Sequence, residues 1–136
     1  SGTGSSRLLG KQGYSLVHAF DPLKNTVASF GPVQASSESM THGAVYDAAN
    51  KAHCVIHIHS PFLFTSLLAK GFPQTPESIA YGTPALSREV TLLIAEKLSP
   101  SEGVFVTAGH NEGVFAYGES IASTLNLILS LNTTKD

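Results

Sequence analysis

The chain has 136 residues, of which 42% are hydrophobic and 13% are charged, and its formal net charge is −2. This length supports one domain with a sizeable core, and the composition excludes an intrinsically disordered chain. Lysine and arginine are scattered along the sequence, which argues against a nucleic-acid or membrane-surface partner. No apolar run approaches the roughly 18 residues of a membrane span, and no signal-peptide pattern opens the chain.

Cysteine usage and charge bear on the compartment and the assembly. The single cysteine, Cys54, excludes an intrachain disulfide and fits a reducing compartment. We therefore expect a cytoplasmic protein. The low charge leaves little surface that must face water, which favours an oligomer.

The first half of the chain predicts a hairpin followed by a helix. Residues 14–20 and 26–30 are expected to form two strands around a turn that contains Asp, Pro and Asn. Residues 35–38, Ala-Ser-Ser-Glu, then lead into a helix that runs to about residue 50. Ser36 or Ser37 is the natural N-cap of this helix, because a hydroxyl there accepts a hydrogen bond from a free backbone N–H group.

Glu38 comes at the start of this helix, where the helix dipole favours a carboxylate. The residue pattern alone favours this interpretation as a first-turn charge, and a carboxylate aimed at a metal is the alternative. His42 lies one turn further on, and we expect it at the surface or behind the site residues.

The chain is organised around a strand over residues 54–59, Cys-Val-Ile-His-Ile-His. Because strand side chains alternate, His57 and His59 share one face, and Cys54 belongs to the apolar face opposite. The two imidazoles are about 6.6 Å apart along the strand. Both can therefore reach a single ion at about 2.0–2.1 Å. A pair of ordinary, partly buried histidines is the alternative.

The second half alternates helices and strands, which predicts a layered α/β domain. The expected helices cover residues 61–70, 84–98 and 121–131, and the expected strands cover residues 103–108 and 113–117. Pro61 and Pro84 mark first helical positions. His110 follows the end of a strand, where the backbone leaves the sheet. Three histidines with one open position form a catalytic zinc arrangement, since the vacancy admits substrate.

Four stretches in this order also carry a resemblance to a known family. They are Ala35 to Glu38 with His42 and Tyr46, Val55 to Pro61, Tyr81 to Thr83 with Leu86, and Val106 to His110 with Gly113 and Gly118. They resemble the Pro-Ser-Ser-Glu helix start, the Val-x-His-x-His segment, the Phe/Tyr-Gly-Thr helix opening and the last-histidine strand of the class II aldolase/adducin family, typified by fuculose-phosphate aldolase. The cupin motif also uses His-x-His, but it expects a glutamate a few residues later, and this chain has none there.

The resemblance implies a fold and a metal site. The fold is a three-layer α/β/α sandwich with a central, mostly antiparallel sheet, in a single domain over residues 1–136. The metal is one Zn²⁺ per chain, held by His57, His59 and His110. Glu38 would be the acid/base. The resemblance also suggests a homotetramer with active sites at subunit boundaries.

The resemblance further implies a binding site for a sugar or a sugar phosphate. Ser36 and Ser37 match residues that hold the substrate's phosphate in the sugar-phosphate members. Thr3 and Gly4 match a Thr-Gly of the same pocket, in a looser alignment. The family's N-terminal helix and Gly-Asn-x-Ser loop have no counterpart in this sequence. The tyrosine that donates a proton in the aldolase is missing too, and Tyr81 or Tyr117 is more readily a packing residue than its replacement.

These features predict a zinc-dependent aldolase-type lyase. It would cleave or form a carbon–carbon bond in a small hydroxy-carbonyl substrate through a metal-stabilised enediolate. Two alternatives stay open. One is an epimerase or dehydratase of the same fold, and the other is a non-catalytic, adducin-like interaction domain.

Overall fold

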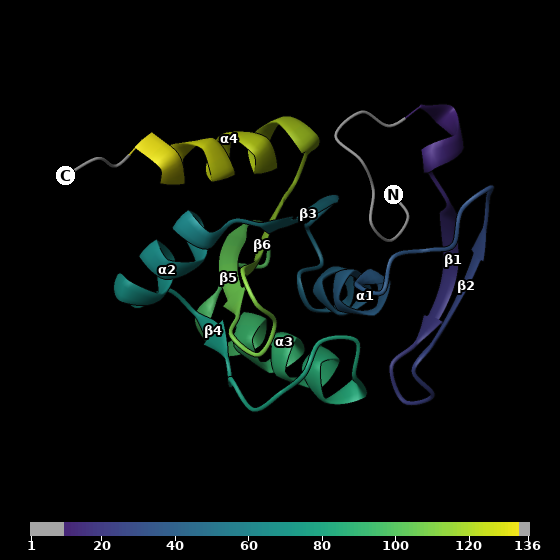
Figure 1. Ribbon diagram of the computed structural model, residues 1–136, viewed down its shortest axis with the longest axis horizontal. Coiled ribbons are helices and arrows are strands. Elements are labelled where there is room, and N and C mark those ends of the chain that lie inside the picture. Colours follow the sequence, from purple (N-terminus) through teal and green to yellow (C-terminus); the bar gives the residue numbers. More distant parts are fainter. Residues whose placement is uncertain (1–9, 134–136) are drawn as a thin grey trace.

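The computed structural model describes residues 10–133 and places them in a mixed α/β architecture with four α-helices (Figure 1). Its elements are a 3₁₀ turn at Lys11–Gly13, β1 (Leu16–Asp21), β2 (Thr26–Phe30), α1 (Ser39–Ala48), β3 (Cys54–His59), α2 (Pro61–Ala69), β4 (Gln74–Thr75), α3 (Pro84–Lys97), β5 (Gly103–Thr107), β6 (Gly113–Gly118) and α4 (Ile121–Thr133). Within the described part of the chain, no helix is both long and apolar enough to cross a membrane.

The main sheet has four strands in the order β3-β6-β5-β4. β6 pairs antiparallel with both β3 and β5, whereas β4 pairs parallel with β5. The sheet is therefore mixed, and two of its three pairings are antiparallel, where we expected a mostly antiparallel sheet. β4 covers only Gln74–Thr75, between the expected helices over residues 61–70 and 84–98, where we expected no strand. Two residues are too few to show a strand periodicity, so only the pairing with β5 defines this strand.

Helices cover both faces of this sheet (Figure 1). One core cluster joins α1 and α3 to the sheet through Phe105, Phe115 and Tyr117, and the other joins α2 and α4 to it through Val104, Val106 and Val114. β3 contributes to both clusters by alternation, because Val55 packs against the first cluster, whereas Ile56 and Ile58 pack against the second. This alternation places the histidines of β3 on the α1 side of the sheet.

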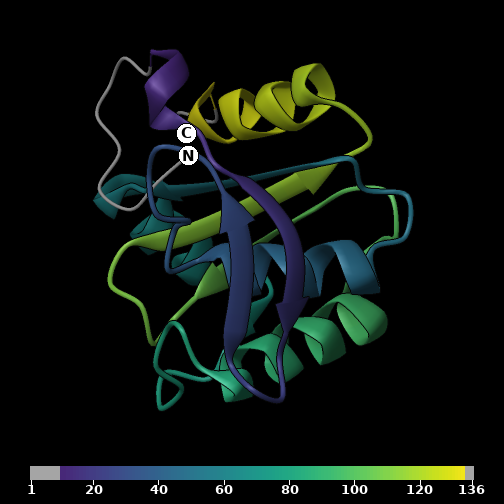
Figure 2. The same cartoon turned by 90° about the vertical axis from the view of Figure 1, so that its right-hand side faces the viewer.

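The hairpin of β1 and β2 forms a separate two-stranded sheet that lies over α1 (Figures 1 and 2). The hairpin prediction is therefore confirmed. Its turn is held by Asp21, whose Oδ1 accepts hydrogen bonds from the backbone N–H groups of Leu23 and Lys24 at 2.9 and 3.1 Å. Phe20 packs directly onto α1 at Gly43, where a Cβ atom would lie 2.6 Å from the phenyl ring. A side chain at this position would therefore force the Phe20 ring to shift.

The start of α1 differs from the prediction. The helix begins at Ser39 with Glu38 as its N-cap residue, so the prediction of Ser36 or Ser37 as N-cap is wrong. Ser36 instead makes the turn that precedes the helix, since its Oγ accepts from the Glu38 N–H at 3.2 Å and its carbonyl oxygen accepts from the Ser39 N–H at 3.0 Å. This turn aims Glu38 inward, and its side chain is only 4% exposed. Glu38 is therefore not a solvated first-turn charge.

Candidate metal centre

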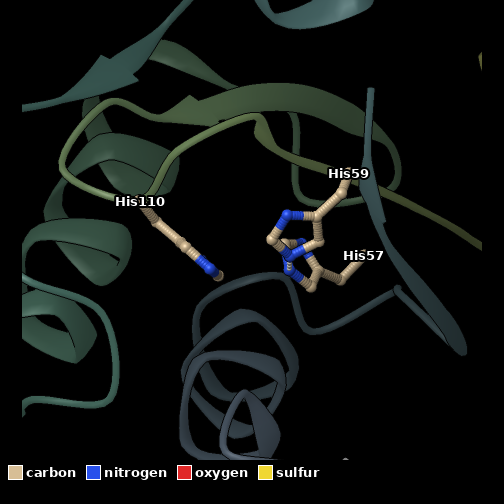
Figure 3. Close-up of side chains that lie close together, drawn as sticks. All are labelled: His57, His59 and His110. Atoms are coloured by element: carbon tan, nitrogen blue, oxygen red, sulfur yellow. Dashed lines mark hydrogen bonds between the residues drawn. The ribbon is translucent and has the colours of Figure 1, made fainter. Parts of the chain in front are cut away.

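Three histidines from two parts of the sheet meet on its α1 side (Figure 3). His57 and His59 come from β3, and His110 comes from the turn between β5 and β6. Each offers one nitrogen, and these three nitrogens lie within 4.8 Å of one another. In Figure 3 the β3 histidines and His110 point toward one another from opposite sides. Their role as metal ligands stays a prediction, but their side chains are close enough to share one ion.

The two histidines of β3 have the spacing of neighbouring ligands. Their Nε2 atoms are 3.1 Å apart, close to the roughly 3.3 Å that separates two nitrogens around a tetrahedral zinc. Nδ1 of His57 lies 3.2 Å from the carbonyl oxygen of Val114. Because a carbonyl only accepts, Nδ1 carries the proton and the Nε2 lone pair remains available. This backbone contact therefore sets the tautomer that a metal requires.

The ring of His57 rests on Phe115. The two residues are register partners across β3 and β6, and their ring centroids are 4.2 Å apart with planes 20° from parallel. Phe115 is fully buried in the core. Burial lowers the pKa of His57 to about 4, with His59 and His110 adding to the decrease and the Val114 carbonyl opposing it. His57 is therefore neutral near pH 7, as a metal ligand must be.

His110 is fixed by the short turn between β5 and β6. Its backbone N–H donates to the Thr107 carbonyl and its carbonyl accepts from the Gly113 N–H, both at 2.9 Å. The Thr107 hydroxyl also donates to the Gly113 carbonyl at 3.2 Å. Burial lowers the pKa of His110, although the nearby Glu38 carboxylate opposes this decrease.

Glu38 lies next to the histidines with one free oxygen. Its Oε2 accepts a hydrogen bond from the Thr41 hydroxyl at 2.9 Å, and its Oε1 lies 3.1 Å from Nδ1 of His110. Among the described residues, neither Oε1 nor this Nδ1 has a partner with hydrogen-bond geometry. A buried carboxylate without a charged partner is costly, and His110 with a lowered pKa is a poor cation. The three imidazoles and the acceptor oxygen therefore fit a bound divalent cation.

A pocket of about 540 Å³ opens beside His57, between the hairpin, α1 and β3. Its polar lining includes Ser15, Ser36, Ser39 and His42. His42, expected at the surface or behind the site, is largely buried, and its ring edge faces Phe115 at 5.6 Å. Burial lowers the pKa of His42 to about 4. The pocket therefore offers hydroxyl groups and neutral imidazoles to a ligand.

Not all of the predicted substrate-binding residues line this pocket. Ser36 lines it, whereas Ser37 is exposed and is not part of the lining. Thr3 and Gly4 lie outside the described residues. Of the two candidate tyrosines, Tyr117 is fully buried and its hydroxyl donates to the Ser99 carbonyl at 2.6 Å.

Sequence reasoning missed the contacts made by three residues of the site. Thr41 lies three residues after Glu38, so its helical spacing was a usable signal. Phe115 faces His57 only through the strand register, which sequence does not give. Tyr81 was interpreted as a packing residue, and its ring stacks on that of His110 with centroids 4.4 Å apart.

Known proteins point to one family. The chain is 29% identical to mouse (Mus musculus) alpha-adducin and 28% identical to rat (Rattus norvegicus) alpha-adducin, each in a 100-residue alignment that covers 66% of this chain. It spans only 13% of the length of these relatives. No solved structure matches it significantly. The sequence model of the class II aldolase and adducin N-terminal domain matches residues 14–134, and the chain therefore belongs to that family.

Proposed function

We propose that this domain is a zinc-dependent lyase of the class II aldolase type. It would cleave or form a carbon–carbon bond in a small hydroxy-carbonyl compound, such as a sugar or a sugar phosphate. The observation that carries this proposal is the free, buried Oε1 of Glu38, which lies 3.1 Å from one member of a three-histidine cluster. The proposal includes the three-layer sandwich and the homotetramer that the resemblance implies.

His57, His59 and His110 would hold the metal. Three imidazoles suit zinc, and they leave a coordination position open for substrate. When bound, a divalent ion supplies Lewis-acid stabilisation of the negative charge that develops on substrate oxygens. The hydrogen bond of His57 to the Val114 carbonyl keeps that ring in its ligating tautomer before any ion arrives.

Glu38 would move the proton. Thr41 holds Oε2, so Oε1 is the oxygen that remains free to face the histidines. From there it would remove a proton from a substrate hydroxyl or from the carbon next to the carbonyl, and return a proton in the reverse direction. The same step serves an epimerase or a dehydratase, so the buried carboxylate supports a proton transfer and leaves the final reaction open.

The pocket beside His57 would hold the rest of the substrate. Hydroxyl groups of Ser36 and Ser39 can donate to or accept from a polyhydroxylated chain. The neutral ring of His42 adds another group that can act in either way. Ser36 therefore remains in the proposal as a substrate-binding residue. Ser37, Thr3 and Gly4 remain as predicted phosphate contacts.

The similarity to mouse and rat alpha-adducin favours a second candidate, a non-catalytic interaction domain of the same fold. Such a domain has no need for a buried carboxylate beside three converging histidines. The retention of this set therefore supports the enzyme. Elemental analysis without added metal separates the two candidates, since the enzyme should hold about one zinc per chain. A chain that holds no metal and takes up none would favour the interaction domain.

Activity can be tested without knowing the acceptor aldehyde. The zinc-loaded protein in D₂O should exchange the protons next to the carbonyl of dihydroxyacetone or its phosphate, followed by NMR. Glu38→Gln should retain zinc and lose exchange by about 10²- to 10⁴-fold, the usual contribution of a general base. Glu96→Gln, an exposed substitution on α3, is the matched control. Full exchange by Glu38→Gln would remove this carboxylate from the mechanism.

A further inference from the structure

The ring of Tyr81 covers one face of His110. Tyr81 lies in the loop between β4 and α3, and its ring is stacked on the imidazole with planes 22° from parallel and centroids 4.4 Å apart. Tyr81 itself is 52% exposed, whereas the side chain of His110 is only 13% exposed. The tyrosine therefore lies on the solvent side of the histidine and shields it.

Backbone contacts bring this loop to the histidine. A Cβ atom on Gly109 would overlap the carbonyl oxygen of Ile79, so only glycine lets the Tyr81 loop approach the residue before His110. The same loop is tied to the hairpin, because the side-chain amide of Asn25 donates to the Gly82 carbonyl at 3.1 Å. These contacts on either side of Tyr81 hold its ring over His110.

His110 needs such support more than His57 does. His57 has a hydrogen bond to the Val114 carbonyl and the buried ring of Phe115 beneath it. Nδ1 of His110 lies 3.1 Å from Oε1 of Glu38, but this contact lacks hydrogen-bond geometry and orients the ring less strictly than the bond of His57 does. Among the described residues, the Tyr81 ring is the one that stacks face to face on His110, whereas the ring of His59 meets it edge-on with centroids 4.7 Å apart. The stacked ring therefore restricts rotation of the imidazole on a face that the other histidines leave open.

We propose that Tyr81 is a positioning residue, whose ring holds the His110 imidazole in the orientation that completes the metal site. This inference rests on the proposed metal-dependent function. It assigns the contribution of Tyr81 to metal affinity to its aromatic ring and not to its hydroxyl group. The stabilisation that an aromatic pair usually provides corresponds to a change of about 3- to 10-fold in the zinc-binding constant, if it acts fully on the ligating orientation of His110.

The test compares zinc affinities of metal-free proteins by competition with a chromophoric chelator. Tyr81→Phe should bind zinc as tightly as the unaltered chain, and Tyr81→Ala should bind about 3- to 10-fold more weakly. Tyr14→Ala is the matched control, since Tyr14 is 53% exposed and no ring contact to a histidine is recorded for it in the described part of the chain. Unchanged affinity in Tyr81→Ala would overturn the proposal. Equal weakening in Tyr81→Phe would overturn it too, because the hydroxyl would then be the active group.

A second measurement separates this proposal from the proposed function. In the metal-free protein, NMR of the His110 ring protons should show a ring-current shift that Tyr81→Phe keeps and Tyr81→Ala loses. If the unaltered chain binds no zinc, the proposed function fails, and these shifts alone decide whether Tyr81 holds His110. Unchanged shifts in Tyr81→Ala would refute the positioning role with or without metal.

Discussion

Acid should destabilise this fold through His42 in a defined pH range. Burial lowers the pKa of His42 from 6.5 to about 4 in the folded chain. Between these two values the unfolded chain binds a proton that the folded chain does not, so stability is lost as the pH falls from about 6.5 to about 4. With these two pKa values, His42 alone should lower the free energy of unfolding by about 2 kcal/mol when the pH falls from 7 to 5.

The perturbation that isolates this effect is His42→Gln, which removes the titrating group. The free energy of unfolding is measured by urea denaturation at pH 7 and at pH 5, with a chelator present. His57 shares the same range, because burial also lowers its pKa to about 4, and it contributes in both proteins. We therefore compare differences between pH values, in which a packing cost that is the same at both pH values cancels.

His42→Gln should reduce the loss between pH 7 and pH 5 by about 2 kcal/mol relative to the unaltered chain. His18→Gln removes an exposed histidine from β1 and measures what a surface histidine contributes to the same difference. If the unaltered chain and His42→Gln lose the same free energy of unfolding between pH 7 and pH 5, the reasoning is refuted. His42 would then have the same pKa in the folded and the unfolded chain, so folding would not desolvate it.

The other predictions concern the metal site. His110→Ala should release zinc while far-ultraviolet circular dichroism stays unchanged, since His110 lies in a turn; unchanged zinc affinity would show that it is not a ligand. Gly109→Ala should force the Ile79 carbonyl away and weaken zinc binding by roughly 10-fold, within the range for groups that orient ligands. Both are followed by chelator competition, and an unaltered affinity in Gly109→Ala would mean that the neighbouring loop does not support the site.

Much of the fold could be predicted from local patterns. The strand over residues 54–59 alternates regularly, and Pro61 and Pro84 mark the first residues of α2 and α3, as expected. β4 could not be predicted in this way, because only its pairing with β5 makes it a strand. The start of α1 was placed too early, since Ser36 and Glu38 both fit a helix start and only the turn made by Ser36 decides between them.

The site was harder to predict than the fold. The pairing of His57 with His59 follows from their spacing, whereas the approach of His110 depends on how β6 pairs with two strands at once. The burial of Glu38 also depends on long-range contacts, because its Oε1 lies 3.1 Å from Nδ1 of His110, far along the chain. The residue pattern alone therefore favoured the wrong environment for Glu38, although the family resemblance suggested its role.

The cost of this arrangement supports the proposal that the site binds a cation. A fold that needed only a stable core would place apolar side chains against Phe115. This chain instead places the imidazoles of His42 and His57 against that ring, and it leaves Oε1 of Glu38 without a hydrogen-bond partner. Natural sequences break local rules of this kind chiefly at functional sites, where a ligand supplies the missing interaction. One divalent ion could replace the contact between the Nε2 atoms of His57 and His59 and also satisfy the unpaired oxygen of Glu38 beside His110. If the proposed site binds zinc, zinc should raise the free energy of unfolding, because the unfolded chain does not have this site.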